Sequence, residues 1–458
     1  MQPSILSALR EIVGSSNCLT SPEERIAYSY DATAMMARQP DAIVFVETAP
    51  QISAVLQLAN AAGFKIVPRG SGTNLSGGTI PCENCVVLVT AKMDQILEID
   101  PRNLTALVQP GVLTAKIDEA AANHGLFYPP DPGSMKISTI GGNVAENSGG
   151  LRGLKYGVTR DYVLGLEIIL PTGELLRCGT KCVKDVAGYS LKDLFIGSEG
   201  TLGIVTQILL KLVPRPASRQ TMLVTFDTMA DAAETVSAII AARIIPCTLE
   251  FLDRTTIRCV EAYAHIGLPL DVEAVLLMET DGHPSVVEDE AARMIDLAKQ
   301  RRAREIRVAQ STEEAERLTT ARRSAFSALA RVSPTVILED ATVPRSELAT
   351  MIDFIRQIAE KYQLRIGTFG HFGDGNLHPT FLCDERNRDE IDRVHAAFRE
   401  IFTKAIALGG TITGEHGVGL AKKEFLEQFV GRTSLDVMHS LKRVLDPNNI
   451  LNPGKIFE

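Results

Sequence analysis

The sequence predicts an α+β protein with more than one domain. Its 458 residues exceed what one ordinary hydrophobic core accommodates. A strand–helix–strand pattern occurs near the N-terminus, and a second alternation of strands and helices begins after residue 216. With 45% hydrophobic and 22% charged residues, the composition is that of a folded globular protein rather than a disordered or fibrous one.

The N-terminal part begins with a helix and a β-α-β pattern. Residues 4–14 carry apolar side chains at helical spacing, and residues 42–46 (AIVFV) are typical of a short buried strand. Residues 51–62 predict a helix that ends at Gly63, and residues 65–67 predict the next strand. Further strands are expected at 86–89, 96–99 and 106–109, and a helix at 114–124.

A ladder of strands and then a second domain follow. The ladder strands are expected at 163–170, 174–178 and 203–212. After the run VPRP, the expected order is strand 222–226, helix 230–243, strand 248–251, a helix, strand 274–279 and helix 285–301. This order is typical of a split β-α-β or ferredoxin-like arrangement, so we place a domain boundary near Pro214.

Charge and composition exclude some classes of partner. The net charge of −9 argues against binding to nucleic acid, which requires a basic surface. No apolar run approaches the ~20 residues of a membrane span, and Arg10 and Glu11 interrupt the N-terminal segment where a signal peptide would be apolar. We therefore expect a cytoplasmic location and leave peripheral membrane association open.

The eight cysteines show no cluster motif. Cys82 and Cys85 form an isolated C-x-x-C, and Cys178 and Cys182 lie four residues apart. Neither pair belongs to the run of cysteines that an iron–sulfur cluster or zinc ribbon requires. A structural role is favoured over a redox or metal-binding role for both pairs.

Two glycine-rich stretches suggest a large bound ligand. Residues 68–78 read PRGSGTNLSGG, follow a predicted strand and contain no acidic side chain, so their N–H groups and hydroxyls could surround a pyrophosphate. The stretch matches neither a Walker A loop nor a G-x-G-x-x-G turn. Residues 129–150 (PPDPGSMKISTIGGNVAENSGG) again offer glycines and small hydroxyls. A surface turn would explain one such stretch, whereas two favour a flat ligand with many hydrogen bonds.

Two histidine motifs lie in the C-terminal half. His371 and His378 occur in TFGHFGDGNLHPT, and Glu415 and His416 occur in ITGEHGVGL. Two histidines and one carboxylate could bind a divalent metal with open positions for substrate. Histidines in a polar core are the alternative, but three of the chain's eight histidines in two glycine-flanked motifs favour a functional site.

Arg322 and Arg323 lie in a predicted helix, TTARRSAFSALARV. Paired arginines usually belong to a solvated helix face, but a site for a carboxylate substrate needs a planar guanidinium. The sequence leaves open which of the two points inward.

Taken together, these motifs resemble the FAD-linked oxidases of the vanillyl-alcohol oxidase and para-cresol methylhydroxylase superfamily, in particular its D-2-hydroxyacid dehydrogenase branch. The resemblance extends from about residue 40 to residue 457. Besides the stretches above, it rests on KYGVTRDYV, KDVAGYSLKDLFIGSEGTLGIVT and LDPNNILNPGKIF. It implies a two-subdomain FAD-binding domain of the PCMH type at 1–216, a ferredoxin-like cap domain at 217–420, and a C-terminal segment at 421–458 that returns to the FAD domain.

The resemblance also implies roles for individual residues. The FAD pyrophosphate would be bound by Pro68, Gly70, Ser71, Gly72, Thr73, Asn74, Gly77 and Gly78. The flavin and adenosine parts would be lined by Pro132, Gly133, Ser134, Thr139, Gly142, Asn143, Gly149, Ile204, Val205 and Asn452. A divalent metal (Fe, Zn or Mn) would be bound by His371, His378 and Glu415, while His416 would act as the catalytic base and Arg322 would bind the substrate carboxylate.

Two departures from the family pattern concern the substrate. Members that act on dicarboxylates carry a Lys where the run VILEDATVP has Leu338, and an Asn where this chain has Thr380. A small monocarboxylate, D-lactate or glycolate, is therefore expected in place of 2-hydroxyglutarate. The loop at 68–78 contains no His, Cys or Tyr, so FAD is expected to be bound non-covalently.

The implied reaction is FAD-dependent oxidation of a small D-2-hydroxyacid to its 2-oxoacid. An oxidase of the same fold that acts on another alcohol is one alternative, and a non-catalytic flavin subunit of a glycolate oxidase complex is another. The sequence contains neither a four-cysteine cluster motif nor a nicotinamide fingerprint. An external electron acceptor is therefore expected: an iron–sulfur subunit, an electron-transfer flavoprotein, a quinone or oxygen.

Overall fold

The computed structural model describes residues 1–457 and divides into two compact units. The first unit comprises Met1–Gly149, Val158–Arg215 and the described residues from Glu415 onward, and the second comprises Gly150–Gly157 and Pro216–Gly414. The first unit is therefore built from three segments that are distant in sequence. The functional domains predicted at 1–216, 217–420 and 421–458 stay predictions.

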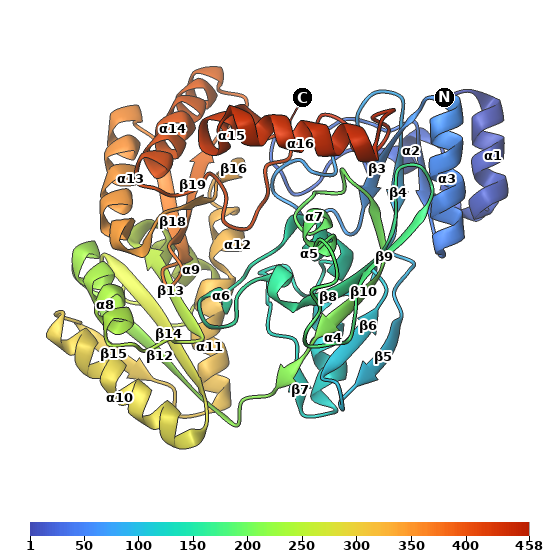
Figure 1. Cartoon of the computed structure of the whole chain (residues 1–458). Helices are drawn as coiled ribbons and strands as arrows, with labels where there is room; N and C mark the ends of the chain where they lie inside the picture. The colour runs from blue at the N-terminus through green and yellow to red at the C-terminus, as the bar shows by residue number, and fades with distance from the viewer. Residues whose placement is uncertain (458) are drawn as a thin grey trace. The chain divides into compact units, whose positions relative to one another are not determined.

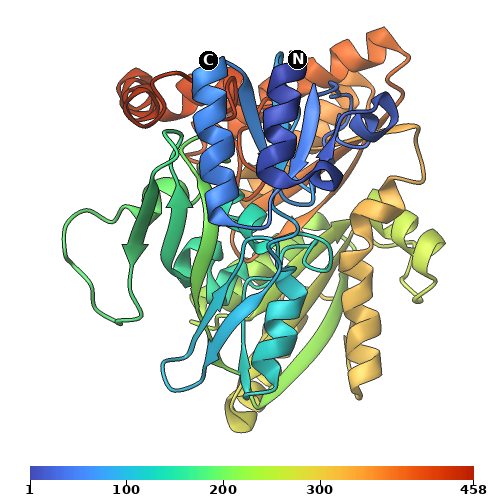
Figure 2. The same ribbon diagram turned by 90° about the vertical axis from the view of Figure 1, so that its right-hand side faces the viewer.

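The first unit contains a four-stranded sheet with the order β1-β2-β4-β3. Its strands are β1 (Cys18–Leu19), β2 (Ala42–Phe45), β3 (Lys65–Arg69) and β4 (Cys85–Val89). β4 lies between β2 and β3 and runs parallel to both, so the predicted β-α-β strands are not neighbours in the sheet. Two helices, α1 (Pro3–Val13) and α3 (Ala49–Ala62), lie side by side (Figures 1 and 2) and bury their apolar side chains in the same core as this sheet.

Local sequence determines where α3 begins and ends. Thr48 accepts a hydrogen bond from Gln51 N, and the Gln51 side chain accepts from Thr48 N, which forms a capping box. The helix ends at Gly63, whose φ of 74° is the left-handed conformation that glycine adopts without strain. β3 then leads directly into the first glycine-rich stretch, as predicted.

A second sheet of the first unit is antiparallel and five-stranded, with the order β5-β6-β10-β8-β9. Its strands are β5 (Ile96–Asp100), β6 (Thr105–Val108), β8 (Val163–Ile169), β9 (Leu175–Gly179) and β10 (Ile204–Lys211), and β7 (Leu126–Phe127) pairs separately with β11 (Val213–Pro214). The other helices of the unit are α2 (Pro22–Ile26), α4 (Thr114–Ala122), α5 (Ile140–Glu146), α7 (Lys192–Phe195), α15 (Lys423–Val430) and α16 (Arg432–Leu445). The chain's C-terminal tail returns to the first sheet, where Asn452 N donates to Ile66 O at 2.7 Å.

The second unit is organised around one antiparallel sheet with the strand order β15-β12-β14-β13-β18-β19-β16. Its strands are β12 (Ser218–Phe226), β13 (Thr248–Asp253), β14 (Ala274–Gly282), β15 (Glu305–Val308), β16 (Thr335–Leu338), β18 (Arg365–His371) and β19 (Asn376–Cys383), and β17 (Ala341–Thr342) also pairs with β19. The first four strands form the predicted split β-α-β arrangement. The sheet then continues through β18, β19 and β16, an extension that the sequence did not predict.

Helices cover both faces of this sheet (Figure 1). One face packs against α9 (Arg254–Ala264), α11 (Thr312–Arg323) and α12 (Ala325–Leu329) through a core that includes Leu223, Leu277 and Phe369. The remaining helices of the unit are α6 (Gly153–Tyr156), α8 (Met229–Ala241), α10 (Pro284–Gln300), α13 (Leu348–Tyr362) and α14 (Arg388–Ala407). The strand and helix content confirms the α+β class. Among the described helices, none is long and apolar enough to cross a bilayer.

Candidate active site

His371 and His378 lie on neighbouring strands of the second unit. His371 ends β18 and His378 lies in β19, and the turn between these strands carries Gly375 with a φ of 85°. The two imidazole rings are nearly perpendicular, with centroids 5.2 Å apart, and both side chains are buried. The antiparallel hairpin therefore brings together two of the predicted metal-binding residues.

Glu250 connects His371 to Arg322. Glu250 and His371 are directly opposite each other on the antiparallel strands β13 and β18, so their side chains share a face of the sheet. Glu250 Oε1 lies 2.7 Å from His371 Nδ1, and Glu250 Oε2 lies 2.6 Å from Arg322 Nε. The Glu250 side chain is 1% exposed, so both contacts lie in the interior of the second unit.

The structure resolves which of the paired arginines points inward. Both lie in the last turn of α11, where Arg322 is buried and Arg323 is exposed. The Arg322 guanidinium carbon lies 4.7 Å from the centroid of the Phe369 ring, in a cation–π arrangement. Arg322 therefore lies on the same face of the sheet as His371.

Asp340 fixes the segment that leads into the second histidine motif. The fully buried Asp340 accepts hydrogen bonds from Gly414 N at 2.8 Å and from Thr413 Oγ1 at 2.7 Å through Oδ2. Asn376 Nδ2 donates to Oδ1, and His378 Nδ1 lies 4.0 Å from the same oxygen. Asp340 therefore holds Thr413 and Gly414, the last residues of the second unit.

The first unit begins again at Glu415. A Cβ at Gly149 would lie 2.8 Å from Glu415 Oε2, so the second glycine-rich stretch and Glu415 are in contact. His416 Nε2 lies 3.8 Å from Glu415 Oε1. The structure thus places the predicted third metal ligand and the predicted base beside a residue predicted to line the flavin.

Glu199 anchors the residues that follow His416. Its carboxylate accepts hydrogen bonds from Val418 N and Gly419 N, both at 2.7 Å. Burial raises the pKa of Glu199 to about 7, although the two N–H donors lower it. Glu146, whose pKa burial raises well above its usual value, lies against Gly417 and Glu199. The segment 415–419 is therefore held over a pair of buried carboxyl groups.

Two glycines determine the backbone path of the loop at 68–78. Gly72 and Gly77 have φ values of 74° and 77°, in the left-handed region that favours glycine. Asn74 Nδ2 donates to Asp31 Oδ2 at 2.8 Å, and Gly77 N donates to Thr33 Oγ1 at 2.7 Å. A Cβ at Gly72 would overlap the Arg69 guanidinium, and one at Gly70 would overlap Thr139 Oγ1. The path of the loop therefore depends on residues without a side chain.

Contact with Thr139 joins the two glycine-rich stretches. Thr139 caps α5, where its Oγ1 accepts from Gly142 N at 3.3 Å, and Asn143 Nδ2 donates to Thr114 Oγ1. Pro132, Gly133 and Ser134 lie in the irregular segment before this helix. Small residues thus bring residues 68–78 and residues 129–150 together, as a shared ligand would require.

Asn452 links the C-terminal tail to the first stretch. Its side-chain Nδ2 donates to Gly78 O at 3.0 Å and to Glu199 O at 2.7 Å. Ile204 and Val205 begin β10, and the buried Ile204 belongs to the core beneath the four-stranded sheet. Four regions that the sequence assigned to the cofactor therefore fall in the first unit.

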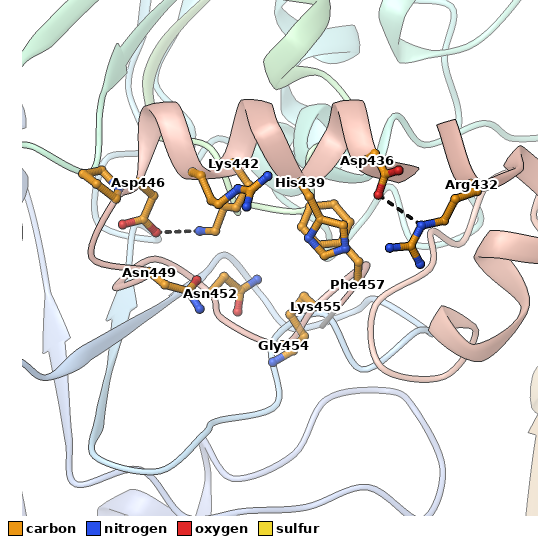
Figure 3. A pocket seen from close by; sticks show the side chains of 12 residues that line it. Arg432, Asp436, His439, Lys442, Asp446, Asn449, Asn452, Gly454, Lys455 and Phe457 are labelled. Atoms are coloured by element: carbon orange, nitrogen blue, oxygen red, sulfur yellow. Dashed lines mark hydrogen bonds and ion pairs between the residues drawn. The ribbon is translucent and has the colours of Figure 1, made fainter. Parts of the chain in front are cut away.

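A pocket of about 410 Å³ lies between α16 and the tail of the first unit (Figure 3). Lys442 points into the protein there and donates to Asp446 Oδ2, Thr201 O and Leu451 O. Of the twelve residues that line the pocket, Asn452 is the one predicted to contact the cofactor. Lys442 and Asp446 hold the tail in place, which is a structural role.

Sequence reasoning missed the buried carboxylates Glu250, Asp340 and Glu199. Glu250 was available as a signal, because a charged residue in the middle of the predicted strand 248–251 needs a buried partner. Asp340 and Glu199 were read only as parts of motifs. Their partners lie 74 and 219 residues away in the chain, at Gly414 and Val418, so no local pattern reveals them.

The fold and the site define a flavin-dependent oxidoreductase. Residues 40–179 match the model described as an FAD binding domain, and residues 215–456 match the model described as FAD linked oxidases, C-terminal domain. The second match covers more than half of the chain. The chain belongs to the FAD-linked oxidases, and the resemblance found in the sequence is confirmed.

Similar proteins extend over the whole chain. The chain is 56% identical over 449 residues to a glycolate oxidase subunit GlcD from Bacillus subtilis, which covers 98% of this chain and 96% of the relative. It is 36% identical to a D-lactate dehydrogenase from Archaeoglobus fulgidus, over 94% of this chain and 95% of the relative. A crystal structure of p-cresol methylhydroxylase with substrate bound shares the fold, with a TM-score of 0.82, 20% identity and coverage of 99% of this chain and 96% of that one.

Proposed function

We propose that the protein oxidises a small 2-hydroxyacid, D-lactate or glycolate, to the corresponding 2-oxoacid. The observation that carries the proposal is the buried set of His371, His378 and Arg322 on one face of the second unit's sheet. Two imidazoles and a guanidinium match a substrate with a hydroxyl and a carboxylate on adjacent carbons. The names of relatives with 56% and 36% identity, a glycolate oxidase subunit and a D-lactate dehydrogenase, support this substrate class.

FAD would accept the hydride, and the loop at 68–78 would bind its pyrophosphate. Gly72 adopts a left-handed conformation and carries no side chain, which suits close approach of an anion, whereas the N–H of the buried Gly77 already donates to Thr33. Residues 132–134, Thr139, Gly142, Asn143, Gly149, Ile204, Val205 and Asn452 would contact the remainder. The proposal that FAD is bound non-covalently rests on the absence of His, Cys and Tyr from the loop at 68–78.

A divalent metal would act as a Lewis acid on the substrate oxygens. His371, His378 and Glu415 would bind it, a set of two imidazoles and one carboxylate that suits Zn²⁺, Mn²⁺ or Fe²⁺. Support comes from the buried histidine pair and from the hydrogen bonds by which Asp340 holds the residue before Glu415. Each of these contacts is made within a single unit.

The protein's own side chains would then position the substrate and move its proton. Arg322, held at Nε by Glu250, would bind the substrate carboxylate through its other guanidinium nitrogens. His416 would accept the proton of the substrate hydroxyl, and Glu199 would hold the following residues still through Val418 and Gly419.

Two positions favour a monocarboxylate. Leu338 and Thr380 are directly opposite each other on β16 and β19, where related dicarboxylate enzymes carry Lys and Asn. Thr380 is fully buried, and its Oγ1 donates to His378 O at 3.2 Å. A second substrate carboxylate would meet no cation at this pair of residues, and leaving it unpaired would be costly.

The electron acceptor is proposed to be external. The name glycolate oxidase subunit, given to the Bacillus subtilis relative, supports a partner protein such as an iron–sulfur subunit or an electron-transfer flavoprotein. A quinone is a further candidate.

Anaerobic mixing with a panel of acids tests the reaction. D-lactate and glycolate are expected to bleach the flavin absorbance of the purified FAD-loaded protein, whereas L-lactate, D-2-hydroxyglutarate and p-cresol are not. If only p-cresol bleached the flavin, an oxidase acting on another alcohol would replace the proposal. If nothing did, the non-catalytic subunit would replace it.

A further inference from the structure

We infer that Glu250 is the positioning residue that fixes both the metal-binding imidazole of His371 and the guanidinium of Arg322. This inference rests on the proposed function, since it assigns a ligand to His371 and a carboxylate to Arg322. Glu250 contacts both of these groups within the second unit.

The contact with Glu250 determines which ring nitrogen of His371 can bind a metal. A carboxylate can only accept, so Glu250 Oε1 at 2.7 Å makes Nδ1 of His371 the donor. The other ring nitrogen, Nε2, then carries the lone pair that a metal requires. Carboxylate–imidazole pairs of this kind orient metal-binding histidines and increase their basicity.

Glu250 also contacts the guanidinium of Arg322. Glu250 Oε2 lies 2.6 Å from Nε, the nitrogen nearest the side-chain stem, and the guanidinium rests over the ring of Phe369 at 4.7 Å. The contact with Glu250 is an ion pair without the alignment of a hydrogen bond, so charge attraction and the Phe369 ring together locate the guanidinium. The terminal nitrogens are then oriented for bidentate binding of a carboxylate.

The Glu250 carboxylate is held in a rigid part of the sheet. Glu250 lies in the middle of β13, with hydrogen-bonded neighbours β14 and β18 on either side, and its side chain is 1% exposed. Buried in a central strand, the carboxylate has little freedom to rotate away from its partners. One side chain therefore sets the relative position of a proposed metal ligand and of the guanidinium that would bind the substrate carboxylate.

The test is a metal titration of four proteins. Metal-stripped, FAD-loaded wild type, Glu250→Gln, Glu250→Asp and Glu279→Gln are titrated with Mn²⁺ by calorimetry, and in parallel with Zn²⁺. Glu279→Gln is the matched control, because Glu279 is a partly buried residue of the adjacent strand β14 whose side chain accepts from Thr221.

Glu250→Gln is expected to weaken metal binding by about 10- to 100-fold, the usual effect of removing such a partner. Its amide can replace only one of the two accepting oxygens, so either His371 or Arg322 loses its partner. Glu250→Asp keeps the charge but shortens the side chain, and is expected to lie between Glu250→Gln and wild type. It provides the test if Glu250→Gln does not fold. The Glu279→Gln protein is expected to bind like wild type.

The inference is overturned if Glu250→Gln, or Glu250→Asp in its place, binds both metals as tightly as Glu279→Gln, or if the wild type binds neither. Flavin bleaching by D-lactate and glycolate, measured on the same wild-type preparation, reports on the proposed function separately. Bleaching with no dependence of metal affinity on Glu250 would reject the inference alone. A metal site that depends on Glu250 in a protein not bleached by either acid would support the inference and reject the substrates.

Discussion

The two units present their candidate site residues in opposite ways. In the first unit these residues are mostly glycines and small hydroxyls in loops, as at 68–78, where backbone shape determines what can bind. In the second unit they are large side chains on β18, β19 and α11, and they lie beside the buried carboxylates Glu250 and Asp340. A cofactor site built from backbone should be sensitive to added atoms, whereas a reaction site built from buried charge should be sensitive to changes of charge at constant shape.

The largest effect is expected from His416→Ala, which removes the proposed base. Turnover should fall by about 10²- to 10⁴-fold, while FAD content and unfolding temperature stay near wild type. Stopped-flow flavin reduction under anaerobic conditions measures the rate. His395→Ala, an exposed residue of α14, is the control. Wild-type turnover in His416→Ala would remove His416 from the mechanism.

Asp340→Asn keeps the shape of the side chain and removes its charge. The new amide would present an N–H group toward donors at Asn376 or at Thr413 and Gly414, so the start of the 415–419 segment should shift. Turnover is expected to fall roughly 10- to 100-fold with FAD bound normally, because small displacements of catalytic groups are costly.

Steady-state kinetics and the flavin-to-protein absorbance ratio measure these two quantities. Asp384→Asn provides the control, since Asp384 pairs with the exposed Arg386 near the end of β19. Loss of FAD together with activity in Asp340→Asn would contradict the separation of the two kinds of site.

Gly72→Ala adds one carbon to the first unit. Alanine at a φ of 74° costs on the order of 1–2 kcal/mol, and its Cβ would also displace the Arg69 guanidinium. FAD affinity should fall about tenfold or more, whereas metal affinity should not change. Fluorescence titration of the apoprotein with FAD measures the FAD affinity, and calorimetry measures the metal affinity. Gly125→Ala has a similar φ of 68° and no atom within 4 Å, so it separates backbone strain from overlap.

The smallest effect is expected in the pH dependence of stability. Burial raises the pKa of Asp253 in the second unit from 3.8 to about 6, and that of Glu199 in the first from 4.5 to about 7. The folded protein binds these protons more tightly than the unfolded chain, so each residue lowers stability as pH rises between its two values. Asp253→Asn should flatten the dependence of the free energy of unfolding on pH between about pH 4 and 6. Glu199→Gln should flatten the same dependence between about pH 4.5 and 7. Urea unfolding across this range would contradict both assignments if the slopes matched wild type.

The sequence predicted the positions of the strands and helices better than it predicted which strands pair with one another. The strands and helices that the sequence predicted within residues 42–301 lie within a few positions of the observed ones, because periodicity and stop signals such as Gly63 are local. The short elements β7, β11, α5, α6 and α7 were not predicted. The insertion of β4 between β2 and β3, and the continuation of the second sheet through β18 and β19, depend on long-range pairing that no local pattern reports.

The same distinction holds for the site. His371 and His378 were found because a hairpin turn separates them, and Asn452 and Gly78 because a family resemblance aligned them. The choice between Arg322 and Arg323 required the structure, since it depends on which face of α11 packs on the sheet. The sequence could flag Glu250 as needing a buried partner but not identify its partners, because they come from β18 and α11, more than seventy residues later.

The return of the C-terminal tail has a consequence for synthesis. In the first unit Asn452 contacts Ile66 and Gly78, and Lys442 contacts Thr201, yet Lys442 and Asn452 are translated after the second unit. A ribosome therefore finishes the whole second unit while the first still lacks its final segment. Chains stalled before residue 432 should show a protease-resistant second unit and a protease-sensitive first unit. If both resisted equally, the tail would be dispensable for folding.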